Sequence, residues 1–510
     1  AAAAAPLVLE GDVPEGGPDH FFLDFDVPAG IREIEVRHDD LSEANILDWG
    51  LDDPAGFRGW GGGNTEPAIV GETAASRSYV PGPITPGRWR VVVGKAKLVA
   101  SPARYRVEVD LRAAPTLPDA PRAPYAAAPP RRTETRWYAG DFHVHSRESG
   151  DARPALEEIV TFAKSRALDF VEISDHNTTT QLDFFQAVQA REPDLLLLPG
   201  IEYTTYAGHA NAVGATRWVD HKIGQPGVTI EAAATDAADA VIAQGALLAV
   251  NHPVLDIGDL CIGCAWGHDL APEKIGAVEI ATGGLKEGGQ LFRDRALGFW
   301  DGLLDRGVKV PAIGGSDDHR AGIPTGSFQS PIGNPTTYVR ATELSARGIV
   351  EGVRRGATVV KLQDKDDPMV ELEAAPRRGG APIAWIGDTV GARSIVLRVK
   401  VTGGAGREVR LVKNGAPLDP VAVTGDPFVH ETVVEPPAAG EDRFRAEALV
   451  DEAPRTVTSH LWVRLDPGGP AVPPPEDDGC GVASGERPLP WGALAVFGVV
   501  ALARVRRARR

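Results

Sequence analysis

The chain has 510 residues, of which 43% are hydrophobic and 24% charged, a composition typical of globular proteins and a length sufficient for three domains. Lys and Arg number 53 against 70 Asp and Glu, and the resulting net charge of -17 opposes binding to a phosphate backbone, so we expect no nucleic-acid partner. Three cysteines are too few for a disulfide framework, and they do not identify the cellular compartment.

Residues 7–112 contain short runs of alternating apolar and polar residues, separated by Gly and Pro. The runs at 31–36, 89–93 and 105–109 each place apolar side chains on one face, which predicts an antiparallel β-sandwich. A Pro- and Ala-rich linker at 113–130 completes a predicted first domain of residues 1–130. Within it, the run 59–63 (Gly-Trp-Gly-Gly-Gly) is interpreted as a turn, with a binding loop as the alternative.

Residues 131–366 change to a pattern of strands alternating with helices. Strands are predicted at 169–173, 195–198, 246–250, 277–280 and 308–313, and helices at 151–167, 231–243 and 291–306. Such alternation predicts an α/β domain with a barrel-like, parallel arrangement of strands.

Residues 367–466 return to a strand pattern, with strands predicted at 394–401, 408–413 and 460–464. Asn414-Gly415 is a strong hairpin signal within this pattern. We therefore predict an Ig-like β-sandwich as the third domain.

The last predicted segment, residues 467–510, begins with a stretch rich in Pro, Gly and acidic residues. Cys480, an apolar run at 491–503 and five arginines follow. About 13 apolar residues reach roughly 20 Å as a helix, which is short of the ~30 Å of a bilayer core. A disordered basic tail is one interpretation of this segment.

The same tail resembles the MYXO-CTERM class, which combines a Gly-Cys element, a short hydrophobic segment and terminal arginines. The resemblance implies export and attachment to the cell surface or outer envelope through Cys480 after the tail is processed. The chain begins at Ala1, and its one methionine is Met369, so we also expect either a removed leader or a trimmed start.

Five polar clusters follow apolar runs of the central region, and they hold six of the twelve histidines. In the first cluster, His143 and His145 alternate on a short strand and therefore project to one side, which suits a metal clamp. The other clusters are 173–177, 199–209, 250–253 and 314–319. Strands of a parallel barrel present such clusters at one end, so we expect them to converge.

Six imidazoles gathered with Asp151, Glu202 and Asp317 would be costly to bury without partners. Divalent cations convert the same set into a satisfied site, and mixed nitrogen and oxygen ligands suit Zn, Mn or Fe equally. The sequence therefore predicts a metal centre without identifying its metal.

The order and spacing of these clusters resemble the PHP (polymerase and histidinol phosphatase) superfamily, and the three-part layout resembles its CehA/McbA-like branch. The resemblance implies a distorted (β/α)7 TIM-like barrel, two or three divalent cations and a metal-bridged hydroxide nucleophile. Glu202 would bridge two metals, and Asp151, where many relatives have histidine, leaves the third metal open. The implied ligands are His143, His145, Asp151, His176, Glu202, His209, His252, Asp317 and His319.

Further roles are expected around these ligands. His176 or His319 would protonate the leaving group if the third metal position is empty. Asp141 and Asp175 would orient ligand histidines, and Asp318 would face solvent or bind a neighbouring loop. Three positively charged side chains flank the motifs and are candidates for binding an anionic substrate: Arg147, Lys286 and Arg320.

Cys261 and Cys264 are separated by two residues, and they lie shortly after His252. We interpret them as a local disulfide, with a role at the metal site as the alternative.

The sequence as a whole favours an exported metal-dependent hydrolase acting on a small phosphomonoester or phosphodiester. One alternative is a carboxylic or carbamate ester hydrolase that uses the same site. The other is a surface-anchored binding or adhesion protein in which the sandwiches carry the function.

Overall fold

The computed structural model describes residues 5–222, 230–283, 289–323, 330–363 and 365–473, and Ala1–Val472 form one compact unit. The predictions for Lys286, Cys480 and the tail beyond residue 473 lie outside the described residues. No helix among the described residues is long and apolar enough to cross a membrane.

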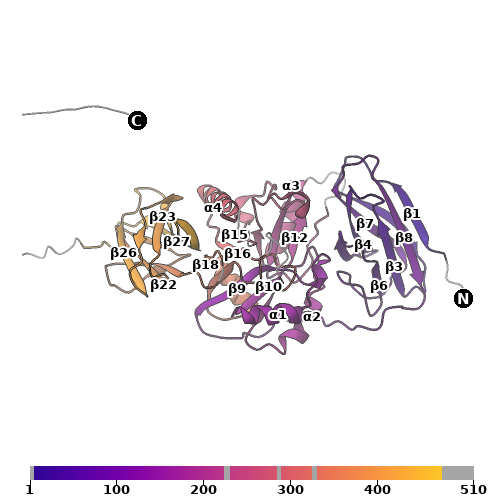
Figure 1. The fold of residues 1–510 in the computed structure, drawn as a ribbon, viewed down its shortest axis with the longest axis horizontal. Coiled ribbons are helices and arrows are strands. Elements are labelled where there is room, and N and C mark those ends of the chain that lie inside the picture. The colour runs from indigo at the N-terminus through magenta and orange to yellow at the C-terminus, as the bar shows by residue number, and fades with distance from the viewer. Residues whose placement is uncertain (1–4, 223–229, 284–288, 324–329, 364, 474–510) are drawn as a thin grey trace, which may run out of the picture. The chain divides into compact units, whose positions relative to one another are not determined.

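The N-terminal region is the predicted sandwich of two antiparallel four-stranded sheets (Figure 1). Their orders are β1-β8-β3-β6 and β2-β7-β4-β5, and a core that includes the buried Trp89 lies between them. The strands are β1 (Leu7–Asp12), β2 (His20–Val27), β3 (Glu33–Asp39), β4 (Ile46–Asp53), β5 (Gly56–Gly62), β6 (Ala68–Gly71), β7 (Gly87–Lys97) and β8 (Arg104–Arg112).

The prediction of a turn at 59–63 is wrong, because residues 59–62 belong to strand β5 and Trp60 is buried. The glycines permit close packing instead. A Cβ at Gly59, where φ is +145°, would collide with the Tyr79 ring.

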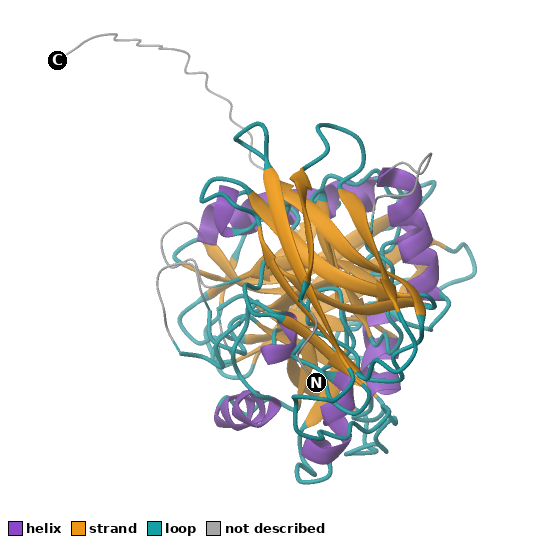
Figure 2. Ribbon diagram, turned by 90° about the vertical axis from the view of Figure 1, so that its right-hand side faces the viewer, coloured by secondary structure: helices purple, strands orange, loops and turns teal. Residues whose placement is uncertain are grey.

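The central region is mixed α/β, with helices outside the strands (Figure 2). Its helices are α1 (Leu156–Ser165), α2 (Leu182–Gln189), α3 (Ile230–Ile242), α4 (Gly289–Asp305) and α5 (Ala346–Arg354), with short 3-10 turns at Arg147–Ser149, Gly258–Leu260 and Pro272–Lys274. Its strands are β9 (Arg136–Val144), β10 (Phe170–Ile173), β11 (Leu196–Pro199), β12 (Glu202–Thr205), β13 (Gly208–Val213), β14 (Leu247–Val250), β15 (Ala277–Thr282), β16 (Ala312–Gly315), β17 (Thr336–Ala341) and β18 (Thr358–Lys361).

The expectation that the central strands are all parallel is wrong. β9, β10 and β11 are parallel, as are β14, β15 and β16, but β12, β13 and β14 pair antiparallel. Only residues 206–207 connect β12 to β13, and so short a connection permits only a hairpin. β17 also runs antiparallel to β9, and the strand predicted at 308–313 begins at Ala312, after Pro311, which has no N–H to donate.

Two sheets meet at the end of the central region where the polar clusters lie. Isolated bridges join Val144 to Asp318 and His176 to Glu202, both parallel. Among the described residues the two sheets do not form one continuous hydrogen-bonded ring, so the closed seven-stranded barrel stays a prediction.

The C-terminal strands pack around a separate apolar core. Asn414 (φ 50°) and Gly415 (φ 82°) form the predicted hairpin turn between β23 and β24. The strands are β19 (Met369–Ala375), β20 (Ala384–Trp385), β21 (Thr389–Ala392), β22 (Ile395–Thr402), β23 (Glu408–Lys413), β24 (Ala416–Pro417), β25 (Val421–Ala422), β26 (Phe428–Val434), β27 (Glu441–Val450), β28 (Ala453–Thr458) and β29 (Leu461–Leu465).

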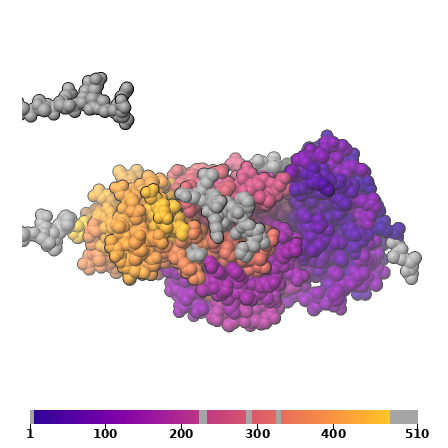
Figure 3. Space-filling view, viewed as in Figure 1, coloured from indigo at the N-terminus to yellow at the C-terminus, as the bar shows by residue number. Residues whose placement is uncertain are grey.

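The C-terminal strands are continuous with the central region through hydrogen bonds. β18 pairs antiparallel with β28, so one sheet of twelve strands crosses the predicted boundary at residue 366. The space-filling view shows the surfaces of these two parts of the chain meeting (Figure 3). The domain bounds themselves stay a prediction.

Candidate metal centre

Eight of the nine predicted ligands lie at one end of the two central sheets, and the ninth, Asp151, follows the 3-10 turn Arg147–Ser149 and contacts two of them. His143 is in β9 and His145 follows it, His176 follows β10, His252 follows β14, and Asp317 and His319 follow β16. Glu202 and His209 come from the hairpin, where the start of antiparallel β13 lies at the same end as the carboxyl ends of the parallel strands. The predicted convergence is therefore present, and the ligand roles themselves stay a proposal.

Glu202 is fully buried at the centre of the cluster, in contact with five imidazoles. Its Oε1 lies 3.3 Å from His143 Nε2, 3.3 Å from His209 Nδ1 and 3.4 Å from His252 Nε2. Its Oε2 lies 3.4 Å from His145 Nε2 and 2.8 Å from His176 Nδ1. The position fits a carboxylate that bridges two cations.

Asp317 closes the inner part of the cluster. Its Oδ1 lies 3.3 Å from His143 Nε2 and 3.1 Å from His145 Nε2. Ligands that hold one cation tetrahedrally at about 2.0–2.1 Å are separated by about 3.3 Å, so this spacing matches the edges of a metal site. The backbone of Asp317 is left-handed (φ 57°), as is that of His252 (φ 26°), and such conformations cluster at functional sites.

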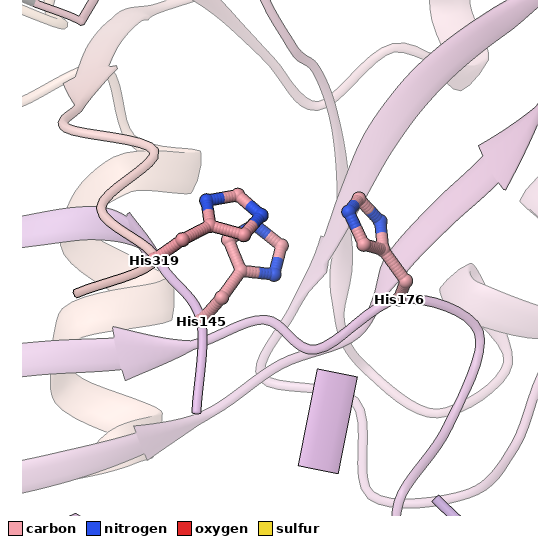
Figure 4. Close-up of side chains that lie close together, drawn as sticks. All are labelled: His145, His176 and His319. Atoms are coloured by element: carbon pink, nitrogen blue, oxygen red, sulfur yellow. The ribbon is translucent and has the colours of Figure 1, made fainter. Parts of the chain in front are cut away.

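A second, more open part of the cluster contains Asp151, which is half-exposed. Its Oδ2 lies 3.3 Å from His176 Nε2 and 3.3 Å from His319 Nε2. The rings of His145 and His319 stack with centroids 4.0 Å apart, and His176 points toward them from the other side (Figure 4). These three histidines and Asp151 form a candidate third cation position.

The outer nitrogen of four ligand rings is held by the protein, which leaves the inner Nε2 free to coordinate. These contacts join His143 Nδ1 to Glu279 Oε1 (3.3 Å), His145 Nδ1 to Ser149 Oγ (3.0 Å), His252 Nδ1 to the Cys264 carbonyl (3.1 Å) and His319 Nδ1 to the Asp317 carbonyl (2.9 Å).

Three inward atoms have no hydrogen-bond partner within the described chain: His143 Nε2, His145 Nε2 and Glu202 Oε2. Buried polar atoms are rarely left unsatisfied, because desolvation without a compensating bond is costly. Cations placed among these atoms remove that cost, so the residues present fit the predicted metals.

Glu202 and His145 have pKa shifts in the direction that metal binding requires. Burial would raise the pKa of Glu202, but His143 and His176 hold it well below its usual value. Burial, together with neighbouring His319 and His176, lowers the pKa of His145 to about 3. Ionised carboxylate and neutral imidazole are the forms that bind metal.

The roles of three nearby aspartates differ from simple ring orientation. Asp141 accepts hydrogen bonds from the backbone N–H groups of His143, Ser316 and Gly333, and Asp175 accepts from the N–H and Oγ of Ser146. The buried Asp318 accepts from backbone N–H groups of the loop that follows it, which agrees with the second of its two expected positions. All three therefore fix the backbone that carries the ligands.

Glu279, in β15, is a site residue that the sequence analysis did not find. Its Oε1 contacts His143 Nδ1, and its Oε2 accepts a hydrogen bond from His252 N (2.8 Å). A buried charge within the apolar run 277–280 was the available signal.

A cavity of about 670 Å³ opens over the cluster, and Arg320 lines it. Arg147 does not line it and is largely exposed. The N-terminal sandwich contributes lining residues that include Asp48 and Trp60, and Trp60 belongs to the run 59–63 for which a binding loop was the alternative interpretation. Tyr206 OH donates to Asp48 Oδ2 (2.7 Å) across this junction.

Cys261 and Cys264 form the predicted local disulfide. The pair also lies beside the metal centre, because the Ile262 carbonyl is 3.3 Å from His209 Nε2 and the Cys264 carbonyl contacts His252. The bridged loop thus supports two ligand rings.

No family model and no curated protein matches the chain. A two-domain protein from Bacteroides vulgatus with a predicted PHP-like metal-dependent phosphoesterase is 18% identical over 66% of this chain and 100% of its own, with a TM-score of 0.34. A Bifidobacterium adolescentis protein described as a metal-dependent phosphoesterase is 15% identical over 38% and 92%, with a TM-score of 0.25. The CARDB domain of a Pyrococcus furiosus protein is 22% identical over 19% and 97%, with a TM-score of 0.14. TM-scores this low give no evidence about function. An argument about function must therefore come from the side chains of the candidate metal centre.

Proposed function

We propose that this chain is a metal-dependent hydrolase that cleaves phosphoesters. The observation that carries the proposal is a single buried carboxylate, Glu202, surrounded by five imidazoles whose inner nitrogens include two without a partner among the described residues. The number and mixture of nitrogen and oxygen donors fit two or three divalent cations such as Zn, Mn or Fe.

When bound, such cations supply the Lewis acidity that activates water and stabilises charge on phosphate oxygens. The protein's part is to hold the donors in place. The four ring contacts described above fix the imidazoles, and Glu202 and Asp317 set the spacing between them.

His319 is suited to hold a proton for the leaving group. Burial would lower its pKa, but Asp151, 3.3 Å away, raises it to about 9, so the ring is protonated at neutral pH when no cation occupies this position. It also lies at the edge of the cavity, where a leaving oxygen would depart. His176 faces the same Asp151 oxygen and could share this role.

The test combines elemental analysis with a substrate panel. Purified protein is expected to contain two or three transition-metal equivalents and to hydrolyse p-nitrophenyl phosphate or bis-p-nitrophenyl phosphate with added Mn or Zn. Metal-dependent turnover of naphthyl esters alone would replace the proposal by the ester-hydrolase alternative. Absence of metal-dependent turnover on every substrate would favour the binding protein.

A His319→Asn variant tests the proton role. It is expected to lose turnover while retaining two tightly bound metals. Loss of a metal equivalent together with turnover would instead assign His319 to a third cation.

We further propose that the protein is exported and attached to the cell envelope, a proposal that rests on the tail sequence. The Cys261–Cys264 disulfide supports it, because disulfides persist mainly in oxidising compartments. Surface proteolysis of intact cells, followed by detection of the chain in the medium, tests it.

A further inference from the structure

A second cavity, of about 400 Å³, adjoins the metal centre on the side of the C-terminal strands. It shares four lining residues with the cavity over the metals: His252, Leu255, Thr282 and Gly283. A molecule bound at the metals could therefore extend past His252 into this space. The proposed function makes no use of it.

Arg293, in the first turns of α4, lines this second cavity with only 10% of its side chain exposed. Its Nε and Nη2 have no hydrogen-bond partner within the described chain. The nearest acid is Asp294, whose Oδ1 lies 3.6 Å from Nε, beyond hydrogen-bond distance, and whose side chain is 54% exposed. The ion pair with Asp294 is therefore long and made with an exposed carboxylate, so it compensates the burial of the guanidinium only weakly.

Two hydroxyls that line the same cavity are also unsatisfied. Thr282 Oγ1 and Ser330 Oγ are buried and have no partner within the described residues. Arg455, the other arginine that lines this cavity, differs because it already donates to Asp367 (3.2 Å). A guanidinium fork with two hydroxyls is a donor set that matches the oxygens of a phosphate or a carboxylate.

We propose that Arg293, Thr282 and Ser330 form a binding site for a second anionic group, so that the preferred substrates are small phosphoesters carrying a further phosphate or carboxylate. The existence of the anion site stands on the geometry alone, whereas the substrate class rests on the proposed function. Arg293 is here a specificity residue that touches the part of the substrate remote from the bond that breaks.

The anion site is tested by calorimetric titration of metal-loaded protein with inorganic phosphate. Arg293→Gln is compared with Arg295→Gln, which changes an exposed arginine of the same helix and leaves the cavity unaltered. Wild type and Arg295→Gln are expected to bind one more equivalent of phosphate than Arg293→Gln. Equal stoichiometry and affinity in all three proteins would overturn the proposal.

The substrate class is tested with three matched compounds: phenyl phosphate, 3-carboxyphenyl phosphate and 1,3-phenylene bisphosphate. Loss of a buried charge-assisted contact is expected to lower kcat/KM for the two doubly anionic compounds about ten- to hundredfold in Arg293→Gln, with phenyl phosphate changed less than about threefold. The two doubly anionic compounds distinguish a carboxylate from a phosphate as the second group. Arg293→Lys, which keeps the charge without the fork, is expected to be intermediate and guards against misfolding as the cause.

The outcomes separate the two proposals. Turnover of phenyl phosphate without any Arg293-dependent preference would overturn the anion site and leave the phosphoesterase intact. Arg293-dependent phosphate binding in a protein that hydrolyses no phosphoester would overturn the phosphoesterase and leave the anion site.

Discussion

The metal centre and the C-terminal strands both bury histidine, yet they surround it in opposite ways. His143 is 0% exposed and lies against Glu202, Asp317 and Glu279, whereas His460 is 1% exposed and lies between the rings of Trp300 and Trp462. Both ring nitrogens of His460 lack a partner in the described part of the chain, and Arg443 and Arg445 are its charged neighbours. Burial alone therefore does not mark a ligand.

The difference is visible in the direction of the pKa shifts. Burial would lower the pKa of both rings, but three carboxylates raise that of His143 well above its usual value, whereas two arginines lower that of His460 further. Carboxylates that attract a proton also attract a divalent cation. The acids around a histidine thus decide whether it can bind metal.

The largest effect is expected when the carboxylate of Glu202, which the histidines of the metal centre share, is removed. Glu202→Gln is expected to abolish stoichiometric metal binding and lower kcat/KM by about 10³-fold or more, because five imidazoles lose their common anionic partner. Elemental analysis and phosphoester turnover measure the two effects.

Glu172→Gln is the matched control. Glu172 is equally buried, and burial raises its pKa well above the usual value, which favours the neutral form that glutamine mimics. Its variant should keep both metal content and turnover. Equal losses in the two variants would mean that general damage to the core, rather than ligation, explains the result.

A smaller effect on metal binding is expected when a contact to the outer nitrogen of a ligand histidine is removed. Glu279→Gln keeps the shape of the side chain but removes the charge that faces His143 Nδ1. Metal affinity is expected to fall about 10- to 100-fold, with metal content restored at higher metal concentration. Competition with a chromogenic chelator measures the affinity, and an unchanged affinity would show that Glu279 only supports the backbone of His252.

The convergence of the candidate ligands was predictable from the sequence, because all but Asp151 lie in or next to strands of the central region whose ends converge. The residues that hold these ligands in place were not predictable. Val171-Glu172-Ile173 and Val278-Glu279-Ile280 have the same local pattern, yet Glu279 contacts two ligand residues whereas neither Glu172 carboxylate oxygen has a partner within the described residues. Strand register and pairing, which depend on contacts distant in sequence, determine which one reaches the site.

The fold was also predictable only in part from the sequence. The alternation of strands and helices correctly predicted most elements, but it did not predict the strands β12, β13 and β17, which pair antiparallel. Nor could the sequence predict that the N-terminal sandwich lines the cavity through Trp60, since that contact joins residues far apart in the chain.

The smallest expected effect concerns His460, the buried histidine that has no carboxylate partner in the described part of the chain. Its pKa in the folded chain lies well below the value near 6.5 of an unfolded chain, so below pH 6.5 unfolding takes up a proton. The free energy of unfolding should therefore fall with decreasing pH, by up to about 1.4 kcal/mol per pH unit from this group.

His460→Leu removes that contribution without breaking a hydrogen bond that the structure describes. Urea midpoints measured at pH 7, 6 and 5 should shift in favour of the variant as the pH decreases, and His430→Leu, on strand β26 of a different sheet, is the control for replacing a histidine by leucine. Parallel pH profiles for His460→Leu and wild type would show that folding does not lower the pKa of His460, and would overturn this side of the comparison.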